Sequence, residues 1–157
     1  MTIKPHDELQ QKLFDMGDAE MFCDGASSGN PGPSGIGVVI NLGDEEALQP
    51  GKNRTYRISE YIGETTNNVA EYTALLRGLE KLELLGIKKV RIFVDSELIA
   101  KQINGVYRVK HTNLIPLWTT TMNILRGFSD YSVTHIPREM NKEADSLARR
   151  AAIRKKG

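Results

Sequence analysis

Three extended apolar segments precede the first helical segment of this chain, and this order constrains the fold more than any other feature. The segments are Glu20–Ala26, Ile36–Leu42 and Thr55–Ile62, and turn-forming stretches separate them, the first of which runs from Ser27 to Gly35. Strands joined by such short turns form an antiparallel meander. The chain therefore begins with a meander, which becomes part of a larger sheet only if later strands join it.

Helical and extended segments alternate in the rest of the chain. Apolar residues recur on one face between Val69 and Leu82, which predicts a long helix that Asn67 or Asn68 caps and Gly86 ends. Strands joined through helices run parallel, so we expect a mixed α/β sheet with helices packed against it. The later segments, alternately strand, helix, helix, strand and helix, are Lys89–Val94, Ser96–Asn104, Asn113–Leu125, Ser129–Ile136 and Asn141–Ile153.

Length and composition fit one compact soluble domain. The chain has 157 residues, 39% of them hydrophobic and 26% charged, which is enough to bury a core without disulfides or metal staples. We assign residues 20–157 to a single domain, and residues 1–19, with a possible short helix over Asp7–Met16, to an N-terminal extension. A single cysteine, Cys23, excludes an intrachain disulfide framework. No leader or membrane span is recognisable, so we expect a cytoplasmic protein without membrane association. We also expect a monomer.

The charge of the chain is balanced but unevenly distributed. The net charge of +1 does not by itself indicate a nucleic-acid binder. The last residues form a basic tail that could attract phosphates, or could simply complement the dipole of the last helix. Both explanations stay open for this tail, which contains Arg149, Arg150, Arg154, Lys155 and Lys156.

Four carboxylates occupy positions that a catalytic or metal-binding role would explain. Asp24 lies within an apolar strand, where an unpaired charge is costly to bury. Asp95 follows directly on a short strand, at an end where α/β proteins often bind ligands. Glu71 and Asp145 each lie about one turn into a predicted helix. Taken singly, these two could complement helix dipoles and Asp95 could cap a helix, so Asp24 is the hardest to explain as purely structural.

Cations would be required if these four side chains converged. Carboxylates brought together repel one another unless positive charge compensates them. Ligands that offer only oxygen select hard ions such as Mg²⁺ or Mn²⁺, and the sequence has no cluster of cysteine and histidine that would indicate zinc. Two such ions suit an in-line attack on a phosphodiester. Convergence itself does not follow from the sequence pattern.

Motifs around the same four carboxylates resemble those of the type-1 ribonuclease H family. The Asp24 segment reads DGASSGNPGP, similar to the family's D-G-(x)4-N-P-G-P, and the Glu71 segment reads TTNNVAE, similar to T-T-N-N-x-x-E. Asp95 lies in VDS, similar to (T/V)-D-S, and Asp145 lies in NKEADSLA, similar to N-x-x-A/C-D-x-L-A. The motifs occur in the family's order and cover about residues 20 to 152. Any one of them would be weak, whereas the four together are a strong indication.

The resemblance implies a fold, an activity and a role for each carboxylate. The fold is a five-stranded mixed sheet with strand order 3-2-1-4-5. The activity is endonucleolytic hydrolysis of the RNA strand of RNA/DNA hybrids by two Mg²⁺ ions, with Mn²⁺ as a substitute, leaving 5′-phosphate and 3′-hydroxyl ends. Asp24 would bridge both ions, and Glu71 and Asp95 would hold the ion near the leaving oxygen. Asp145 would hold the ion that carries the attacking water.

The resemblance also implies contacts to the hybrid. Glu71 and the backbone around Gly25 and Ser27 would contact ribose 2′-hydroxyls, which distinguish RNA from DNA. The predicted contacts to minor-groove edges, sugars and one DNA phosphate come from Asn30, Asn67, Asn68 and Thr66.

Three departures from the family pattern bear on substrate choice and turnover. Glu64 stands where many members have an arginine, which should weaken a phosphate pocket. The segment Gly105–Thr112 is short where several bacterial members carry a long basic handle, so the chain resembles the handle-less archaeal and bacterial members. Many members also place a mobile histidine before the last helix. Here we expect Arg138 in that auxiliary role, with His135, a strand residue expected to be buried, as its competitor.

Two other functions are compatible with these motifs. A relaxed nuclease that also cuts double-stranded RNA would exploit the A-form geometry that both duplexes share. A non-catalytic hybrid-binding module would keep the fold without the chemistry. The presence of all four carboxylates disfavours the second, because an acidic pocket facing phosphates is of no use to a binding protein.

Overall fold

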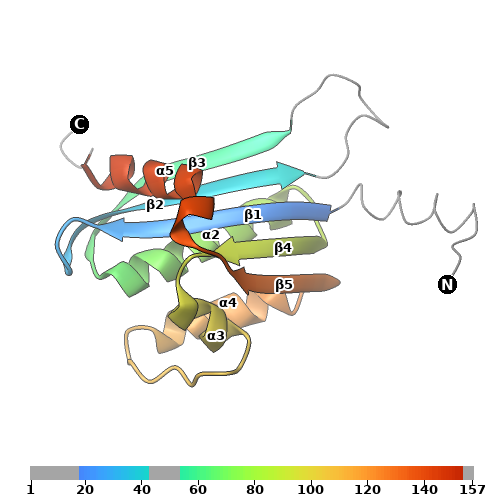
Figure 1. The fold of residues 1–157 in the computed structure, drawn as a ribbon. Helices are drawn as coiled ribbons and strands as arrows, with labels where there is room; N and C mark the ends of the chain where they lie inside the picture. Colours follow the sequence, from blue (N-terminus) through green and yellow to red (C-terminus); the bar gives the residue numbers. More distant parts are fainter. Residues whose placement is uncertain (1–17, 43–53, 154–157) are drawn as a thin grey trace, which may run out of the picture.

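Five strands form one mixed sheet with helices on both faces in the computed structural model (Figure 1). The structure describes residues 18–42 and 54–153. Residues 1–17 of the predicted N-terminal extension, with its possible short helix, lie outside this range. The last basic residues of the tail, 154–156, also lie outside it. In the part of the chain that is described, no helix is long and apolar enough to cross a membrane.

The strand arrangement confirms the predicted mixed sheet. The meander β1 (Asp18–Ser27), β2 (Gly32–Leu42) and β3 (Thr55–Thr65) is antiparallel throughout. Next to β1, on its other side, β4 (Lys89–Val94) and then β5 (Asp130–His135) run parallel to it. The resulting order is β3-β2-β1-β4-β5, as the family resemblance implied.

Helices cover the two faces of the sheet unequally. The larger core lies on the face covered by α2 (Asn67–Leu84), α3 (Glu97–Ile103) and α4 (Ile115–Leu125). A short 3₁₀ turn, η1 (Arg138–Met140), leads into α5 (Lys142–Ile153), which crosses the opposite face over the meander (Figure 1). The small cluster beneath α5 consists of Val39, Ala144 and Leu147, with Phe22 against it.

Apolar periodicity predicted the long helix correctly because its buried side chains share one face. Tyr72, Leu75, Leu79 and Leu82 of α2 are fully buried against the sheet. Burial of such side chains contributes about 1.5–3 kcal/mol each, which is enough to fix this helix on the sheet. Gly86 follows the C-cap of α2 with a φ of +76°, a conformation that favours glycine, as predicted.

The cap at the other end of α2 differs from the prediction. The side chain of Thr66, rather than that of Asn67 or Asn68, accepts a hydrogen bond from the Val69 amide at 3.3 Å. Asn67 is engaged elsewhere, because its Oδ1 accepts from the Ser27 amide at 2.9 Å. Its own amide donates to Oδ1 of Asn30 at 3.0 Å. The start of α2 is thereby tied to the turn between β1 and β2.

That turn is shorter than the run of turn-forming residues suggested. β2 begins at Gly32 rather than at Ile36, and β3 continues to Thr65 rather than ending at Ile62. The two strands shift register between Ser34 and Gly35, and Gly63 on the partner strand has a φ of +89°. A bulge of this kind accommodates glycine and proline within a strand pair, so the pairing extends past residues that composition assigns to a loop.

Candidate active site

Three of the four predicted carboxylates meet at one end of the sheet. Asp24, Glu71 and Asp95 each offer a carboxylate oxygen, and these oxygens all lie within 4.8 Å of one another. The strand register explains two of them, since Cys23 pairs with Val94 and the next residues, Asp24 and Asp95, emerge side by side. The position of Asp95 at the carboxyl end of β4 was expected. Its neighbour Ser96 caps α3 through a 3.2 Å contact with the Ile99 amide, which leaves Asp95 available to the site.

Glu71 reaches this group because β1 and α2 approach closely at Gly25. A Cβ atom at Gly25 would lie 2.3 Å from the carbonyl carbon of Ala70 and 2.4 Å from the amide nitrogen of Glu71. Glycine is therefore required here by space. The Gly25 amide lies 3.0 Å from Oδ1 of Asp24 and 3.3 Å from Oε1 of Glu71, so one donor serves both carboxylates.

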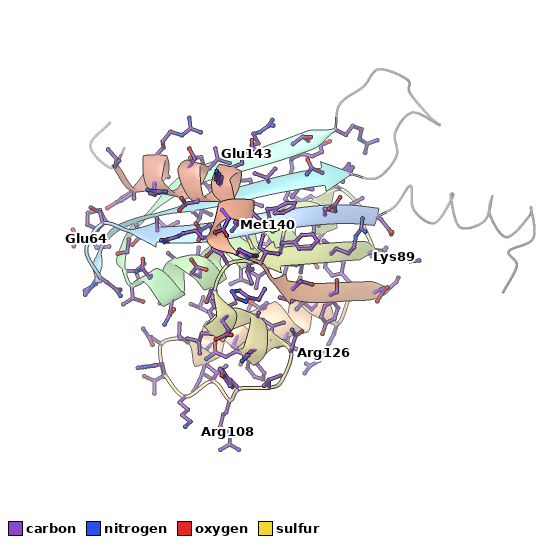
Figure 2. All side chains as sticks on the ribbon, in the orientation of Figure 1. Glu64, Lys89, Arg108, Arg126, Met140 and Glu143 are labelled. Atoms are coloured by element: carbon purple, nitrogen blue, oxygen red, sulfur yellow. The ribbon has the colours of Figure 1, made fainter. Side chains whose placement is uncertain are left out.

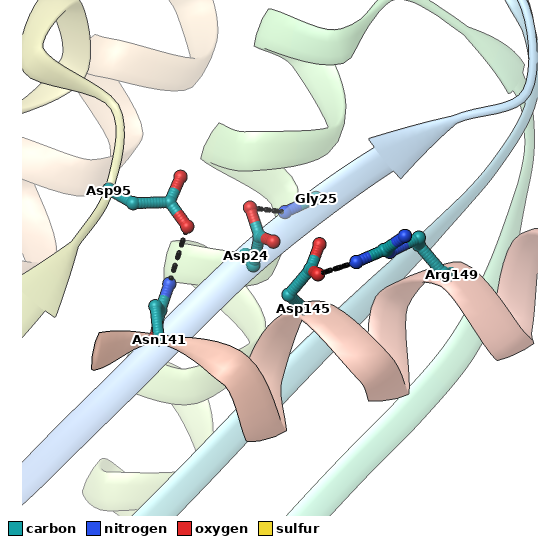
Figure 3. A network of polar contacts seen from close by, with 6 residues as sticks. All are labelled: Asp24, Gly25, Asp95, Asn141, Asp145 and Arg149. Atoms are coloured by element: carbon teal, nitrogen blue, oxygen red, sulfur yellow. Dashed lines mark hydrogen bonds and ion pairs between the residues drawn. The ribbon is translucent and has the colours of Figure 1, made fainter. Parts of the chain in front are cut away.

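Asp145 lies next to Asp24 but stands apart from the group of three. It projects from the first turn of α5 and is buried. Its Oδ2 accepts from Nε of Arg149 at 3.0 Å and also from Nη2 of the same side chain (Figure 3). Gly37, the cross-strand partner of Asp24, lets α5 come this near, because a Cβ there would lie 2.0 Å from the Ala144 carbonyl oxygen.

Burial and mutual repulsion disfavour full ionisation of this cluster. Burial, then contact with Glu71 and the charge of Asp95, raise the pKa of Asp24 to about 11. Burial likewise raises the pKa of Glu71 to about 7, although hydrogen bonds and the charge of Arg138 oppose the shift. Burial would also raise the pKa of Asp145, but the Arg149 guanidinium and the contact with Asp24 outweigh it and hold that pKa below its usual value. The cluster is short of positive charge, and its oxygen-only donors fit a hard divalent cation.

Two residues that the sequence analysis did not assign to the site hold these carboxylates. Nδ2 of Asn141 donates to Oδ2 of Asp95 at 3.0 Å (Figure 3). It also donates to the carbonyl of Cys23, again at 3.0 Å. Arg149 holds Asp145 through its two hydrogen bonds to Oδ2. Position offered a signal for both. Asn141 directly precedes α5, and its carbonyl accepts from the Asp145 amide at 3.0 Å. Arg149 lies four residues after Asp145 on the same helix, a spacing at which side chains share one face.

A cleft of about 450 Å³ opens beside the carboxylates. Four of the predicted substrate-binding residues line it, namely Gly25, Ser27, Asn67 and Asn68. Asn30 and Thr66 are not among its lining residues. Both contact the start of α2, where Asn30 accepts from the Asn67 amide and Thr66 caps the helix.

Arg138, and not His135, faces this cleft. Arg138 lines it together with Glu71 and Asp145, and its charge lowers the pKa of both carboxyls against the effect of burial. His135 is the last residue of β5, which confirms that it belongs to the strand. The expectation that it is buried was wrong. β5 is an edge strand of the sheet, and His135, at its end, is exposed.

Two of the departures from the family pattern, Glu64 and the short segment after α3, concern residues on the surface. Glu64 is exposed beside the turn between β1 and β2, where it pairs with Pro33 of β2 (Figure 2). Arg108 extends from the segment between α3 and α4, away from the sheet (Figure 2). Neither residue contributes to the cleft lining.

Comparison with known proteins relates the chain to ribonucleases H. Residues 22–151 match the family described as reverse transcriptase-like. The chain is 37% identical over 135 residues to ribonuclease HI of Halobacterium salinarum, covering 86% of this chain and 64% of that protein. It is 35% identical over 126 residues to a bifunctional protein of Mycobacterium tuberculosis, covering 80% of this chain and 33% of that protein. The chain thus spans less than two thirds of the length of these relatives.

Solved structures agree with this relationship. Ribonuclease H1 of Halobacterium salinarum superimposes with a TM-score of 0.78 at 34% identity, covering 87% of this chain and 98% of that one. LC11-RNase H1, isolated from compost, was solved in complex with an RNA/DNA hybrid. That structure matches with a TM-score of 0.77 at 42% identity and covers 88% of this chain and 99% of its own. The chain therefore belongs to the type-1 ribonuclease H family.

Proposed function

We propose that this chain is a metal-dependent endonuclease that hydrolyses the RNA strand of RNA/DNA hybrids and leaves 5′-phosphate and 3′-hydroxyl ends. The observation that carries the proposal is the convergence of Asp24, Glu71 and Asp95 within 4.8 Å, with Asp145 beside Asp24. The names of the relatives, and the hybrid bound by LC11-RNase H1, support the substrate class.

The carboxylates divide into two overlapping sets for cations. Asp24, Glu71 and Asp95 would hold one Mg²⁺, and Asp24 with Asp145 would hold a second, so Asp24 belongs to both sets. Mn²⁺ would substitute, because it favours the same oxygen ligands. When bound, the two ions would supply an activated water and charge stabilisation for the leaving oxygen.

The chain's own residues prepare this chemistry. The Gly25 amide and the Asn141 side chain fix carboxylate oxygens of Asp24, Glu71 and Asp95 before substrate arrives. Such preorganisation lowers the reorganisation needed in the transition state. Arg138 would assist water positioning or product release by donating hydrogen bonds. It would not act as a base, because an arginine side chain offers hydrogen-bond donors and no acceptor.

Substrate recognition would come from the polar wall of the cleft. Gly25 and Ser27 would contact 2′-hydroxyls through their backbone, as would Glu71 through its side chain. Asn67 and Asn68 line the cleft, Asn30 accepts from the Asn67 amide, and Thr66 caps the helix that carries both asparagines. All four side chains would contact the hybrid.

The proposal extends to the organisation of the protein. Residues 20–157 would act as one catalytic domain that works as a monomer. The cytoplasm stays the expected location, and the buried state of Cys23 is compatible with a structural thiol in a reducing compartment.

A broader substrate range is the second candidate. Glu64 is exposed where many family members carry an arginine, and the short segment after α3 offers little basic surface. Weaker hold on the DNA strand would leave A-form shape as the main criterion, and this would admit double-stranded RNA.

One experiment separates these functions. The purified chain is incubated with matched RNA/DNA, RNA/RNA, DNA/DNA and single-stranded RNA in Mg²⁺, Mn²⁺ or EDTA. Metal-dependent cutting of the RNA in the hybrid, with DNA/DNA intact, is the expected result, and the RNA/RNA lane decides between strict and relaxed selectivity. Hybrid binding without cutting in either metal would refute the enzyme and favour a non-catalytic module.

A further inference from the structure

Arg149 is placed differently from the other basic residues near the end of the described chain. It lies on α5, its side chain is 67% exposed, and it lines the cleft together with Asp145. Arg150, the next residue, is also exposed but does not line the cleft. The basic character predicted for the end of the chain therefore includes one arginine that belongs to the site.

Arg149 binds only one of the two carboxylate oxygens of Asp145. Nε and Nη2 of Arg149 both donate to Oδ2 of Asp145, and neither donates to Oδ1 (Figure 3). A guanidinium that grips one oxygen through two donors fixes the rotation of the carboxylate. The buried carboxylate is thus held in one orientation by a partner that approaches from solvent.

We propose that Arg149 is a positioning residue that holds the Asp145 carboxylate by Oδ2 and leaves Oδ1 ready to bind a divalent cation beside Asp24. The inference rests on the proposed function, because it assigns Asp145 to a cation. It goes further in making cation affinity at Asp145 depend on a neighbour one helical turn away that binds no cation itself.

Two effects of Arg149 on cation binding oppose each other. Its positive charge repels an arriving cation, whereas its hydrogen bonds orient a ligand. The repulsion is weakened because the guanidinium is largely exposed and water screens it. Loss of a hydrogen-bonding partner behind a metal ligand typically lowers affinity by about 10–100-fold. Since repulsion offsets part of this, we expect the lower end of that range, about tenfold.

Cation binding to the full chain without nucleic acid tests the inference. Isothermal titration with MnCl₂ is made on the unmodified chain, Arg149→Met, Arg149→Lys and Arg150→Met. We expect Arg149→Met to weaken the weaker of two Mn²⁺ binding steps about tenfold. Arg149→Lys should recover part of the loss, because an ammonium can donate but lacks the planar fork. Arg150→Met loses the same charge on the same helix and should bind Mn²⁺ like the unmodified chain.

A double variant separates positioning from a general charge effect. In an Asp145→Asn background, Arg149→Met should cause no further loss of Mn²⁺ affinity, because the carboxylate it positions is gone. Equal or tighter Mn²⁺ binding by Arg149→Met, or an equal loss in Arg150→Met, would overturn the inference. If Arg149→Met does not fold, Arg149→Lys still decides it, since undiminished affinity there would exclude a role for the fork. Absence of any Mn²⁺ binding by the unmodified chain would instead overturn the proposed function.

Discussion

Replacement of Asn141 by alanine should destabilise the fold and the site together. Asn141 is 1% exposed, and its Nδ2 joins Asp95 to the carbonyl of Cys23 in the central strand. Removal of this amide leaves the Cys23 carbonyl buried without that donor. It also frees the Asp95 carboxylate to rotate away from Asp24 and Glu71.

The size of the effect follows from the two lost hydrogen bonds. The bond to the buried Cys23 carbonyl contributes about 1 kcal/mol, because Cys23 also pairs with both neighbouring strands. The bond to the Asp95 carboxylate contributes about 2 kcal/mol, because hydrogen bonds to charged groups are stronger than those between neutral groups. Oδ1 of Asn141 is buried with no partner among the described residues, so its removal regains about 1 kcal/mol. The expected net loss in the free energy of unfolding is about 2 kcal/mol.

Urea unfolding of the Asn141→Ala variant in EDTA measures this loss, and Asn104→Ala provides the matched control. Asn104 likewise donates through Nδ2 to a backbone carbonyl, that of Val133, at 2.9 Å, but it is exposed and does not line the cleft. We expect its replacement to cost about 1 kcal/mol or less, with cleavage unchanged. A loss at Asn141 no larger than that at Asn104, with normal turnover, would refute the positioning argument.

The remaining predictions concern the carboxylates, the loop before α5 and one glycine. Asp24→Asn should abolish hybrid cleavage and raise the free energy of unfolding in EDTA by about 1 kcal/mol, because burial, and then its acidic neighbours, oppose ionisation of the carboxyl that it removes. Near-normal turnover would remove Asp24 from the site. Arg138→Ala should lower kcat more than His135→Ala, because of these two residues only Arg138 lines the cleft. Steady-state kinetics measure both values, and the reverse order would assign the auxiliary role to the histidine. Gly37→Ala should cost about 3 kcal/mol in urea unfolding, because its Cβ would collide with the Ala144 carbonyl; an unchanged midpoint would contradict the close approach of α5.

The sequence predicted the elements better than their ends. Periodicity identified α2 because Leu75, Leu79 and their neighbours must all face the sheet. It placed the start of β2 too late, since Pro33 and Gly35 belong to turn-forming residue types and their place in a bulged strand depends on β3. Asn67 was expected to cap α2, but a contact with Ser27, distant in sequence, engages its side chain instead.

The sequence singled out the four carboxylates of the candidate site, but not their geometry or the side chains that hold them. Asp24 stood out alone, because an aspartate inside an apolar strand is hard to explain by local structure. Glu71, Asp95 and Asp145 had adequate local explanations, and only the family motifs joined them. Asn141 and Arg149 were missed because their contribution lies in which oxygen they bind, and this depends on side-chain orientations that spacing does not determine.

The residues that depart most from strand preferences share one geometric consequence. Asp24, Gly25 and Gly37 are all unfavourable in the interior of a strand. Gly25 admits the backbone of α2 next to β1, and Gly37, opposite Asp24, admits the backbone of α5 next to β2. Each close approach delivers a carboxylate, Glu71 from one face of the sheet and Asp145 from the other. The acidic cluster is therefore built by removing side chains from the sheet around one aspartate, and a methyl group at either glycine should disturb cation binding before it unfolds the chain.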